Sequence, residues 1–310
     1  MGWKGKGEGM TSTAQSVNLS GRALVRVTGE DAEKFLQAII TTDLDDLNPG
    51  ELKPGALLTP QGKILFDFFV VEDEEGYLFD CAGLQKEDLV KRLMFYRLRA
   101  DLKIEDVGAD YRVWAAWDGD VAGVGQEAGA SVARDGGVWF RDPRVAEAGF
   151  RAILPRDSTP DGAAASAQDY HAFRIGLGLA DTMADLGSAE LFPHEANFDQ
   201  FHGVDFAKGC YVGQEVVSRM EHRGTGARKR IVPVRIRGGV LENGAQIAAG
   251  GKGIGEVLSS AGEVALALVR LDRAEDAATN GNALLVEDKP VELVQPRWAK
   301  FTVPQTSVAT

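Results

Sequence analysis

Apolar and polar positions in the first third of the chain follow two periods, one typical of strands and one typical of helices. Short apolar runs bounded by turn residues predict strands at 22–27, 56–59, 63–71 and 77–80. Within the third strand one carboxylate, Asp67, stands among seven apolar neighbours at 64–71. Helical spacing predicts helices over 30–40 and 86–98. In the second helix we expect four residues to face the core: Leu89, Val90, Leu93 and Met94.

The pattern changes after residue 110 to short strands separated by glycine-rich turns. Strands are predicted at 111–117, 138–141 and 151–154, and a helix over 165–175 that ends at Gly176. From residue 231 onward short strands recur at regular spacing, which predicts a small antiparallel β-barrel. The fold class is therefore α+β, with antiparallel sheets in the mixed part.

These changes of pattern also predict the domain boundaries. We expect a disordered N-terminal segment, a mixed α/β domain in two subdomains, a C-terminal barrel and a frayed tail. Their ranges are 1–16, 17–230 (subdomains 17–110 and 111–230), 231–304 and 305–310. Residues 224–226 are expected to form a flexible link.

Composition narrows the class of protein. The 310 residues are 44% hydrophobic and 26% charged, as in ordinary globular proteins, and no apolar run approaches the roughly 20 residues of a membrane span. The N-terminus has no apolar stretch typical of a secretory signal. Two cysteines make no disulfide scaffold, which favours a reducing compartment: the cytoplasm, or the mitochondrial matrix in a eukaryote. Cys81 is expected to be a small buried hydrophobic residue.

Charge argues against indiscriminate nucleic-acid binding, because the chain carries a net charge of −12. One local exception lies at 208–230, where six Lys or Arg stand against two Glu, a balance of +4. This stretch is either a patch for an anionic ligand or partner, or a solvated linker. We expect a monomer that binds no membrane.

The densest set of functional groups lies between residues 192 and 224. This window holds three of the four histidines and the run Lys-Gly-Cys-Tyr-Val-Gly-Gln-Glu at 208–215. A cation close to Cys210 favours its thiolate, the reactive and metal-binding form, although a structural cysteine in a tight turn is the alternative. The spacing of Cys210 and the histidines matches no structural zinc pattern, so no permanent metal is expected.

The run at 208–215, preceded by Pro-His-Glu-Ala-Asn-Phe-Asp at 193–199, resembles the signature of the YgfZ branch of the glycine-cleavage T-protein superfamily. The resemblance implies a folate-binding protein that supports assembly or repair of iron–sulfur clusters. It also implies a tetrahydrofolate pocket between the N-terminal subdomains and a C-terminal barrel. Partners would be folate and, transiently, iron–sulfur assembly proteins or client enzymes.

Two positions depart from the transferase members of that superfamily. Those proteins carry paired acids where this chain has Phe66-Asp67, and a pterin-binding glutamate where it has Gly176. Asp67 therefore either faces a ligand pocket or lies on the open face of its strand. The resemblance favours the pocket, but the loss of a second acid argues against aminomethyl transfer.

The candidate site combines these observations. Cys210 and Asp67 are the candidate catalytic or reactive residues. Gln214 and Glu215 offer hydrogen-bonding groups suited to a pterin, and Lys208 and Arg219 suit the glutamate tail of folate. The folate-binding candidates are Asp67, Glu195, Asn197, Asp199, Lys208, Tyr211, Gln214, Glu215 and Arg219.

Three functions remain open on the sequence. The first is the folate-binding accessory protein in iron–sulfur cluster assembly or repair. The second is a tetrahydrofolate-dependent one-carbon transferase of the aminomethyltransferase type, so enzymatic activity is left undecided. The third is a non-catalytic regulator that binds protein or RNA, related to tRNA modification.

Overall fold

The computed structural model describes residue 10 and residues 14–222 and 227–305. The chain divides into two compact units, the first built from Met1–Ala167 and Phe201–Gln214 and the second from Gln168–Gln200 and Glu215–Thr310. The chain therefore passes from one unit to the other three times.

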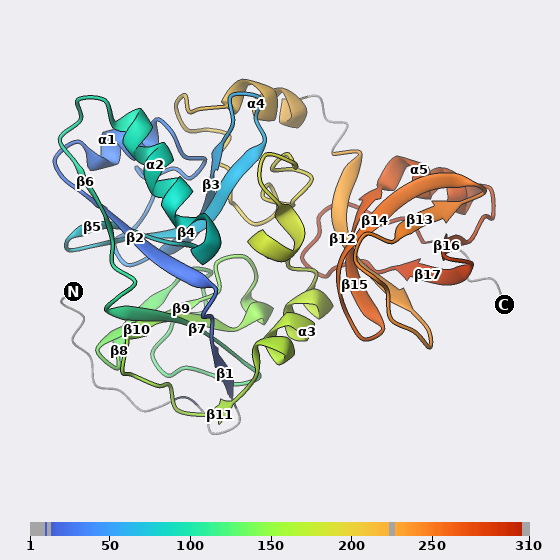
Figure 1. Cartoon of the computed structure of the whole chain (residues 1–310), viewed down its shortest axis with the longest axis horizontal. Helices are drawn as coiled ribbons and strands as arrows, with labels where there is room; N and C mark the ends of the chain where they lie inside the picture. The colour runs from blue at the N-terminus through green and yellow to red at the C-terminus, as the bar shows by residue number, and fades with distance from the viewer. Residues whose placement is uncertain (1–9, 11–13, 223–226, 306–310) are drawn as a thin grey trace. The chain divides into compact units, whose positions relative to one another are not determined.

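A five-stranded sheet forms the first layer of unit one (Figure 1). Its strands, in spatial order, are β3 (Leu52–Leu58), β4 (Ile64–Asp73), β5 (Gly76–Ala82), β2 (Arg22–Thr28) and β6 (Lys103–Asp106). All neighbouring strands are antiparallel.

This sheet is buried on both faces, which explains the long apolar run in β4. Phe66, Phe68 and Val70 belong to one hydrophobic cluster, which includes residues of both nearby helices. Phe69 and Val71 belong to a second cluster, shared with strands of the other sheet of unit one. Because successive side chains of a strand alternate between faces, a strand between two cores reads as continuously apolar.

Helices α1 (Ala32–Gln37) and α2 (Lys86–Arg97) contribute to the first of these clusters through residues such as Leu36, Leu89 and Leu93. Helix α1 is shorter than the predicted 30–40, and the side chain of its N-cap Asp31 makes no capping hydrogen bond to the helix; it accepts from the backbone N–H of Asp101 instead. The expectation that Met94 faces the core is wrong, since 47% of its surface is exposed. The 3₁₀ turn η1 (Gly83–Gln85) leads into α2.

A six-stranded sheet completes unit one. Its spatial order is β11 (Ala163–Ala164), β1 (Gln15–Asn18), β7 (Tyr111–Trp117), β10 (Phe150–Pro155), β9 (Gly137–Arg141) and β8 (Ser131–Arg134), with η2 (Ala146–Ala148) between β9 and β10. Only the pair of β1 and β11 is parallel within this sheet. Strand β1 begins inside the segment expected to be disordered, while residues 1–9 and 11–13 lie outside the described range.

The barrel predicted for the C-terminal part is confirmed in unit two, as is the α+β class. Six strands close in the order β12 (Lys229–Ile236), β15 (Val264–Arg270), β14 (Lys252–Ala261), β13 (Gln246–Ala249), β16 (Leu284–Val286) and β17 (Lys289–Leu293). Their inward side chains form one hydrophobic core. Helix α5 (Leu271–Thr279), which sequence reasoning missed, packs on this core through Ala274 and Ala277.

Three further helical segments carry or flank the signature window. They are α3 (Ala167–Leu177), the π-helix Thr182–Leu186 and α4 (Gln214–His222). Gly176 lies inside α3, so the prediction that this helix ends there is wrong by one residue. The link expected at 224–226 lies outside the described residues, as does nearly all of the tail expected at 305–310.

Candidate functional site

The signature segment begins with a lysine that anchors it to unit one. Lys208 is 6% exposed, and its Nζ donates hydrogen bonds to the backbone oxygens of Ile40 at 2.9 Å and Thr42 at 2.6 Å. Asp205 Oδ1 accepts from the backbone N–H of Lys208 at 2.9 Å. These bonds fix the start of the segment to the residues that follow α1. Lys208 is therefore a structural anchor in this structure.

Burial changes the chemistry of this amine. It lowers the pKa of Lys208 to about 8, against the opposing attraction of the nearby carboxylates Asp43, Asp205 and Asp45. Desolvation disfavours the ammonium form, and this effect outweighs the acidic neighbours. The neutral amine still has two N–H groups, enough for both of its carbonyl partners.

A glycine near the end of the segment packs directly on unit one. Gly213 has φ of +81°, and a Cβ added there would lie 2.4 Å from the backbone oxygen of Thr59. The same atom would lie 3.2 Å from Cα of Gly62, in the turn between β3 and β4. Only glycine fits this close approach, because any side chain would meet backbone.

Cys210 lies between these two anchors and is exposed. Together with Gly209 it borders an open hollow of about 410 Å³. The other lining residues are Glu30, Glu33, Lys34, Gln37, Ala38 and Asp45, all from unit one. A Cβ added at Gly209 would meet nothing within 4 Å. The thiol is thus displayed beside open space, on a segment held at both ends.

Tyr211 turns the opposite way from Cys210, into the protein. It is 6% exposed, and the Lys208 Nζ lies 5.4 Å from the centre of its ring. Its hydroxyl is buried and has no hydrogen-bond partner among the described residues. Burial, reinforced by the charge of Asp205, raises the pKa of Tyr211. Buried hydroxyl groups normally form a hydrogen bond. The Tyr211 hydroxyl is therefore a candidate hydrogen-bond partner for a ligand or a water molecule.

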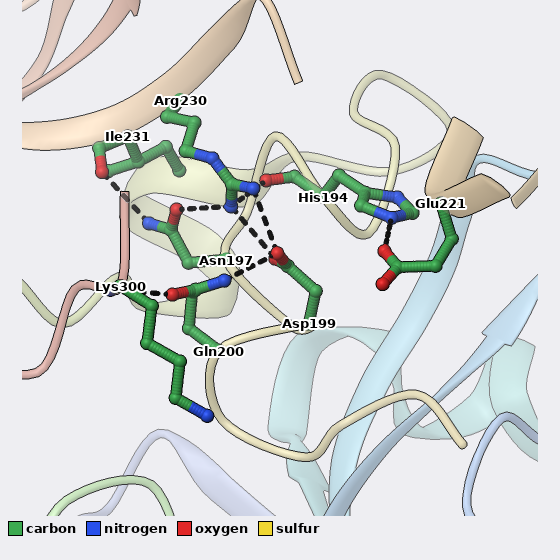
Figure 2. Close-up of polar contacts among 8 residues, drawn as sticks. All are labelled: His194, Asn197, Asp199, Gln200, Glu221, Arg230, Ile231 and Lys300. Atoms are coloured by element: carbon green, nitrogen blue, oxygen red, sulfur yellow. Dashed lines mark hydrogen bonds and ion pairs between the residues drawn. The ribbon is translucent and has the colours of Figure 1, made fainter. Parts of the chain in front are cut away.

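The upstream half of the window belongs to unit two and forms a buried polar network (Figure 2). Arg230, at the start of β12, makes a two-pronged ion pair with Asp199, with both N–O distances 2.8 Å. The same guanidinium donates to the backbone oxygen of His194 at 2.9 Å and to Asn197 Oδ1 at 3.2 Å. Asn197 in turn donates to the backbone oxygen of Ile231 at 2.8 Å.

The remaining members of this segment extend the network. Gln200 donates to Asp199 and accepts from the backbone N–H of Lys300 at 2.9 Å (Figure 2). Glu195 accepts from the backbone N–H of Phe192 at 2.9 Å, and its own backbone oxygen accepts from Ile231. Asn197 has φ of +63°, a conformation that asparagine tolerates better than most residues. The side chains of Asn197 and Asp199 are thus committed to joining 192–200 to β12.

The other candidates of the window lie on or beside α4. Gln214 begins the helix, and its side chain donates to the backbone oxygen of Lys208 at 3.4 Å. Glu215 and Arg219 form an ion pair of 2.5 Å one turn apart, and both are well exposed. The buried His194 contacts Glu221 through Nε2 at 2.9 Å.

Asp67 lies elsewhere in unit one, in β4 opposite Ala56, and is half-buried. The strand alternation puts it on the same face of the sheet as Phe69. That face carries Arg22, which interacts electrostatically with both Asp67 and Asp80. Asp67 is not among the residues that line the hollow beside Cys210.

The structure therefore assigns the candidate residues to two different units. Lys208, Cys210, Tyr211 and Gln214 belong to unit one, as does Asp67, whereas Glu195, Asn197, Asp199, Glu215 and Arg219 belong to unit two. Two of the six basic residues of the supposed patch at 208–230 are buried, Lys208 and Arg230. A third, Arg223, lies outside the described residues.

Sequence reasoning missed two features. The role of Arg230 was hidden in a basic run, although its place next to a predicted strand was a signal. A larger hollow of about 730 Å³ in unit one, bordered by His202, Glu127 and Asp205, left no local signal because its walls come from distant segments. Among the described residues no group of three or more His, Cys, Asp or Glu is arranged to hold a metal ion. None of the helices described is both long and apolar enough to span a membrane.

Comparisons with known proteins agree with this architecture. Residues 228–301 match the family described as the C-terminal β-barrel domain of CAF17. The solved aminomethyltransferase T of the glycine cleavage system from Bartonella henselae has the same fold, with a TM-score of 0.75 over 96% of this chain and 88% of that one. Sequence identity between the two is 15%, so this likeness concerns the fold alone.

Other known proteins are more similar to this chain in sequence. The human protein named iron–sulfur cluster assembly factor IBA57, mitochondrial, is 32% identical over 273 residues, which cover 81% of this chain and 76% of the human protein. Its homologue from Mycosarcoma maydis is 33% identical over 241 residues, which cover 72% of this chain. The match spans 58% of the length of that fungal relative.

Proposed function

The chain belongs to the family of the iron–sulfur cluster assembly factor IBA57, and we propose that it binds tetrahydrofolate and supports assembly or repair of iron–sulfur clusters in client enzymes. Cys210 is its reactive thiol in this proposal. The observation that carries it is the placement of Cys210, exposed beside a hollow, on a segment fixed by Lys208 and Gly213. A rigid, accessible thiol suits brief contact with a partner or its cargo.

The arrangement favours a transient role in cluster handling. A thiolate can supply one bond to iron, while a permanent cluster usually takes four cysteine ligands. Cys81 adds none, because it is buried and its pKa is raised to about 12 by that burial. The remaining ligands would come from assembly proteins or client enzymes. The names of the relatives include the word mitochondrial, which supports a matrix location in a eukaryotic source. In a bacterial source the proposed location is the cytosol.

The residues present fit a folate in part. Tyr211 offers a buried hydroxyl that no described residue uses, and Asp67 offers a half-buried carboxylate for the amidine edge of a pterin. Asn197 and Asp199 are bonded to Arg230, so they support the proposal less. A bound tetrahydrofolate supplies a carrier for one-carbon units. The protein would bind and orient it through Asp67 and Tyr211.

Several observations speak against the two alternatives. Phe66, which stands where transferases carry a second acid, is 6% exposed and packs in the core. Gly176 is exposed on α3, with no carboxylate at that position. Lys208 and Arg230 are buried, so their charges do not contribute to a nucleic-acid-binding surface at 208–230. These findings favour an accessory protein over a transferase or an RNA-binding regulator.

Calorimetric titration with tetrahydrofolate tests the ligand. We expect a Kd on the order of micromolar, weakened about tenfold in Asp67→Asn and in Tyr211→Phe, as lost buried hydrogen bonds require. Asp276→Asn removes an exposed carboxylate on α5 that lines neither hollow, and is the matched control that should bind normally. Absence of binding to the wild type would reject the folate part. Formation of methylene-tetrahydrofolate would support a transferase in its place.

Complementation tests the thiol. A strain that lacks the protein should recover the activity of its iron–sulfur enzymes with the wild type and fail to recover it with Cys210→Ala. Cys81→Ala is the control, because that thiol is buried and should not be needed for function. Full enzyme activity in a strain carrying only Cys210→Ala would sink the proposed role, provided that the variant accumulates to the same level.

A further inference from the structure

Helix α2, which lies on the five-stranded sheet of unit one (Figure 1), is apolar on two opposite sides. Leu89 and Leu93 on one side belong to the hydrophobic cluster of that sheet. The other side carries Met94, Phe95 and Leu98, which are 47%, 71% and 89% exposed. At about 100° per residue these three share one sector of the helix, turned away from the two buried leucines. A helix on a protein surface normally has one apolar stripe, so the second stripe marks an interaction surface.

The backbone at the end of α2 holds Leu98 in a conformation that suits glycine. Leu98 is the C-cap of the helix, with φ of +50° and ψ of −105°. Such a positive φ is an outlier for a bulky side chain and costs stability, whereas glycine adopts it freely. The stability of the helix end therefore does not explain a leucine at this position. Its exposed side chain points to a role at the surface.

The charges around this apolar group are mainly basic. Residues 84–103 contain six Lys or Arg and three Asp or Glu, a balance of +3 in a chain whose net charge is −12. At the start of the helix, Asp88 pairs with Lys91 at 3.2 Å, and Lys86 pairs with Asp106. The stretch 92–99, at the other end, has no carboxylate and three arginines: Arg92, Arg97 and Arg99. None of these arginines forms an ion pair with another of the described residues.

We propose that the C-terminal end of α2, residues 92–99, docks on an anionic lipid membrane. Met94, Phe95 and Leu98 would enter the boundary between headgroups and acyl chains, as the apolar faces of interfacial helices do. The three arginines would lie around them at the level of the lipid phosphates, with their aliphatic stems along the apolar surface.

Two further features fit this placement. The ring of Phe95 contacts the half-buried Tyr96 edge to face, with 5.6 Å between the ring centres, and tyrosine is a common residue at the membrane interface. The exposed carboxylate of Glu87 lies in the first turn, about 10 Å along the helix from Met94, so it stays away from the inserted end. A single anchor of this size gives weak, reversible attachment.

A lipid surface fits this end of α2 better than two protein occupants. A second copy of the chain would bring the three arginines against their own counterparts, and like charges disfavour such a symmetric pair. A helical segment of an acidic protein would be received in a groove, but residues 84–103 line neither of the two hollows of unit one. The net charge of −12 opposes membrane docking only weakly, because salt screens charges that lie beyond about 8 Å.

This inference departs from the expectation that the chain binds no membrane. That expectation weighs the length of apolar runs and the charge of the whole chain, and a patch at 92–99 changes neither. Membrane docking is also independent of the folate and thiol proposals, because Asp67, Tyr211 and Cys210 lie outside α2.

Flotation of the full chain with lipid vesicles tests the proposal. The probes are phosphatidylcholine vesicles with and without about one-third phosphatidylglycerol, at an ionic strength of about 0.1 M. We expect the chain to float with the anionic vesicles and not with the neutral ones. Salt near 1 M should release it, because the screening length then falls to about 3 Å. A wild type that does not float with anionic vesicles overturns the proposal in favour of an acidic protein as the occupant.

Leu98→Gly separates membrane docking from the stability of the helix. Glycine relieves the strain at a φ of +50°, so the melting temperature should rise by a few degrees. Binding to anionic vesicles should nevertheless weaken about tenfold, because an apolar side chain is lost from the lipid. A more stable variant that binds vesicles as well as the wild type would overturn the assignment to α2.

Substitutions of single neighbours locate the surface. Phe95→Ser should weaken vesicle binding about tenfold and Arg99→Gln about fivefold, for the loss of one apolar group and one cation near the phosphates. Two exposed residues of unit two serve as matched controls, Met183→Ser for the apolar change and Arg228→Gln for the charge. Both controls should bind like the wild type. Equal losses in the controls and in the α2 variants would contradict docking through residues 92–99.

Discussion

Segments 192–200 and 208–214 look alike in the sequence, dense in polar groups and close together, yet the structure uses them in different ways. In the first, Asn197 and Asp199 are joined to Arg230 inside unit two. In the second, buried bonds at Lys208 and close packing at Gly213 leave Cys210 exposed beside a hollow in unit one. A polar motif can therefore hold a fold together or display a reactive group. Exposure of the side chain distinguishes the two cases.

The largest expected effect on stability comes from breaking the polar network of the first segment. Arg230→Met leaves the carboxylate of Asp199 nearly buried without its cation, and should lower the free energy of unfolding by about 3–5 kcal/mol. Urea denaturation followed by circular dichroism measures it. Arg228→Met, an exposed neighbour, is the control and should change stability by less than about 0.5 kcal/mol. Equal effects of the two substitutions would contradict the structural role assigned to Arg230.

The second expected effect concerns the packing of the signature segment. Gly213→Ala forces a Cβ against the backbone oxygen of Thr59 at a φ of +81°, and should cost about 3 kcal/mol. Gly209→Ala has open space around it and should change stability by less than about 1 kcal/mol. Thermal or urea unfolding of the matched pair checks this difference. If Gly213→Ala were as stable as Gly209→Ala, the segment would not rest on the β3–β4 turn.

A third effect uses the buried amine of Lys208. Its pKa is about 8 in the folded protein and near 10.5 when unfolded, so between these values the unfolded chain binds more protons and stability rises with pH. Relative to Lys208→Met, which cannot titrate there, the wild type should gain about 2 kcal/mol between pH 7.5 and 9.5. Urea unfolding of both proteins across this window measures the difference. A difference that stays flat would contradict a buried, desolvated ammonium.

The smallest effect on stability should come from the residue with the greatest expected effect on function. Because Cys210 is exposed, Cys210→Ser should change the free energy of unfolding by less than about 0.5 kcal/mol. In the native protein Cys210 should react with a thiol reagent more than about a hundredfold faster than Cys81, whose burial raises its pKa to about 12. Mass spectrometry of the labelled peptides separates the two. Equal labelling would mean that the segment opens readily.

Much of the fold was predictable because it depends on local patterns. Residues 64–71 read as a strand since both faces of their sheet are buried, and the short strands after residue 231 do form a closed barrel. Met94 was predicted to face the core because periodicity predicts a helix but does not show which of its apolar residues are buried. Helix α5 was missed because its buried side chains are alanines, which give a weak apolar signal.

The site was less predictable, because spacing along a chain does not show which side chains are already bonded. Asp199 and Lys208 both read as ligand-binding groups, and both are bonded within the protein, to Arg230 and to backbone oxygens. Cys210 was chosen from the signature, and its exposure adds a physical reason for that choice. The folate-binding roles of Asp67 and the other candidates stay predictions.

The order of the chain has a consequence for synthesis on the ribosome. Unit one takes its last segment, Phe201–Gln214, from beyond the first stretch of unit two. Proteins emerge N-terminus first and domains generally fold as units, so unit one is complete only with residues made about thirty positions after its first stretch ends. Until Gln214 has left the exit tunnel, the turn between β3 and β4 lacks the glycine that packs against it. A nascent chain would therefore present its thiol on an unanchored segment until Gly213 packs, and the hollow beside Cys210 lacks two of its lining residues until the first stretch of unit two has been made.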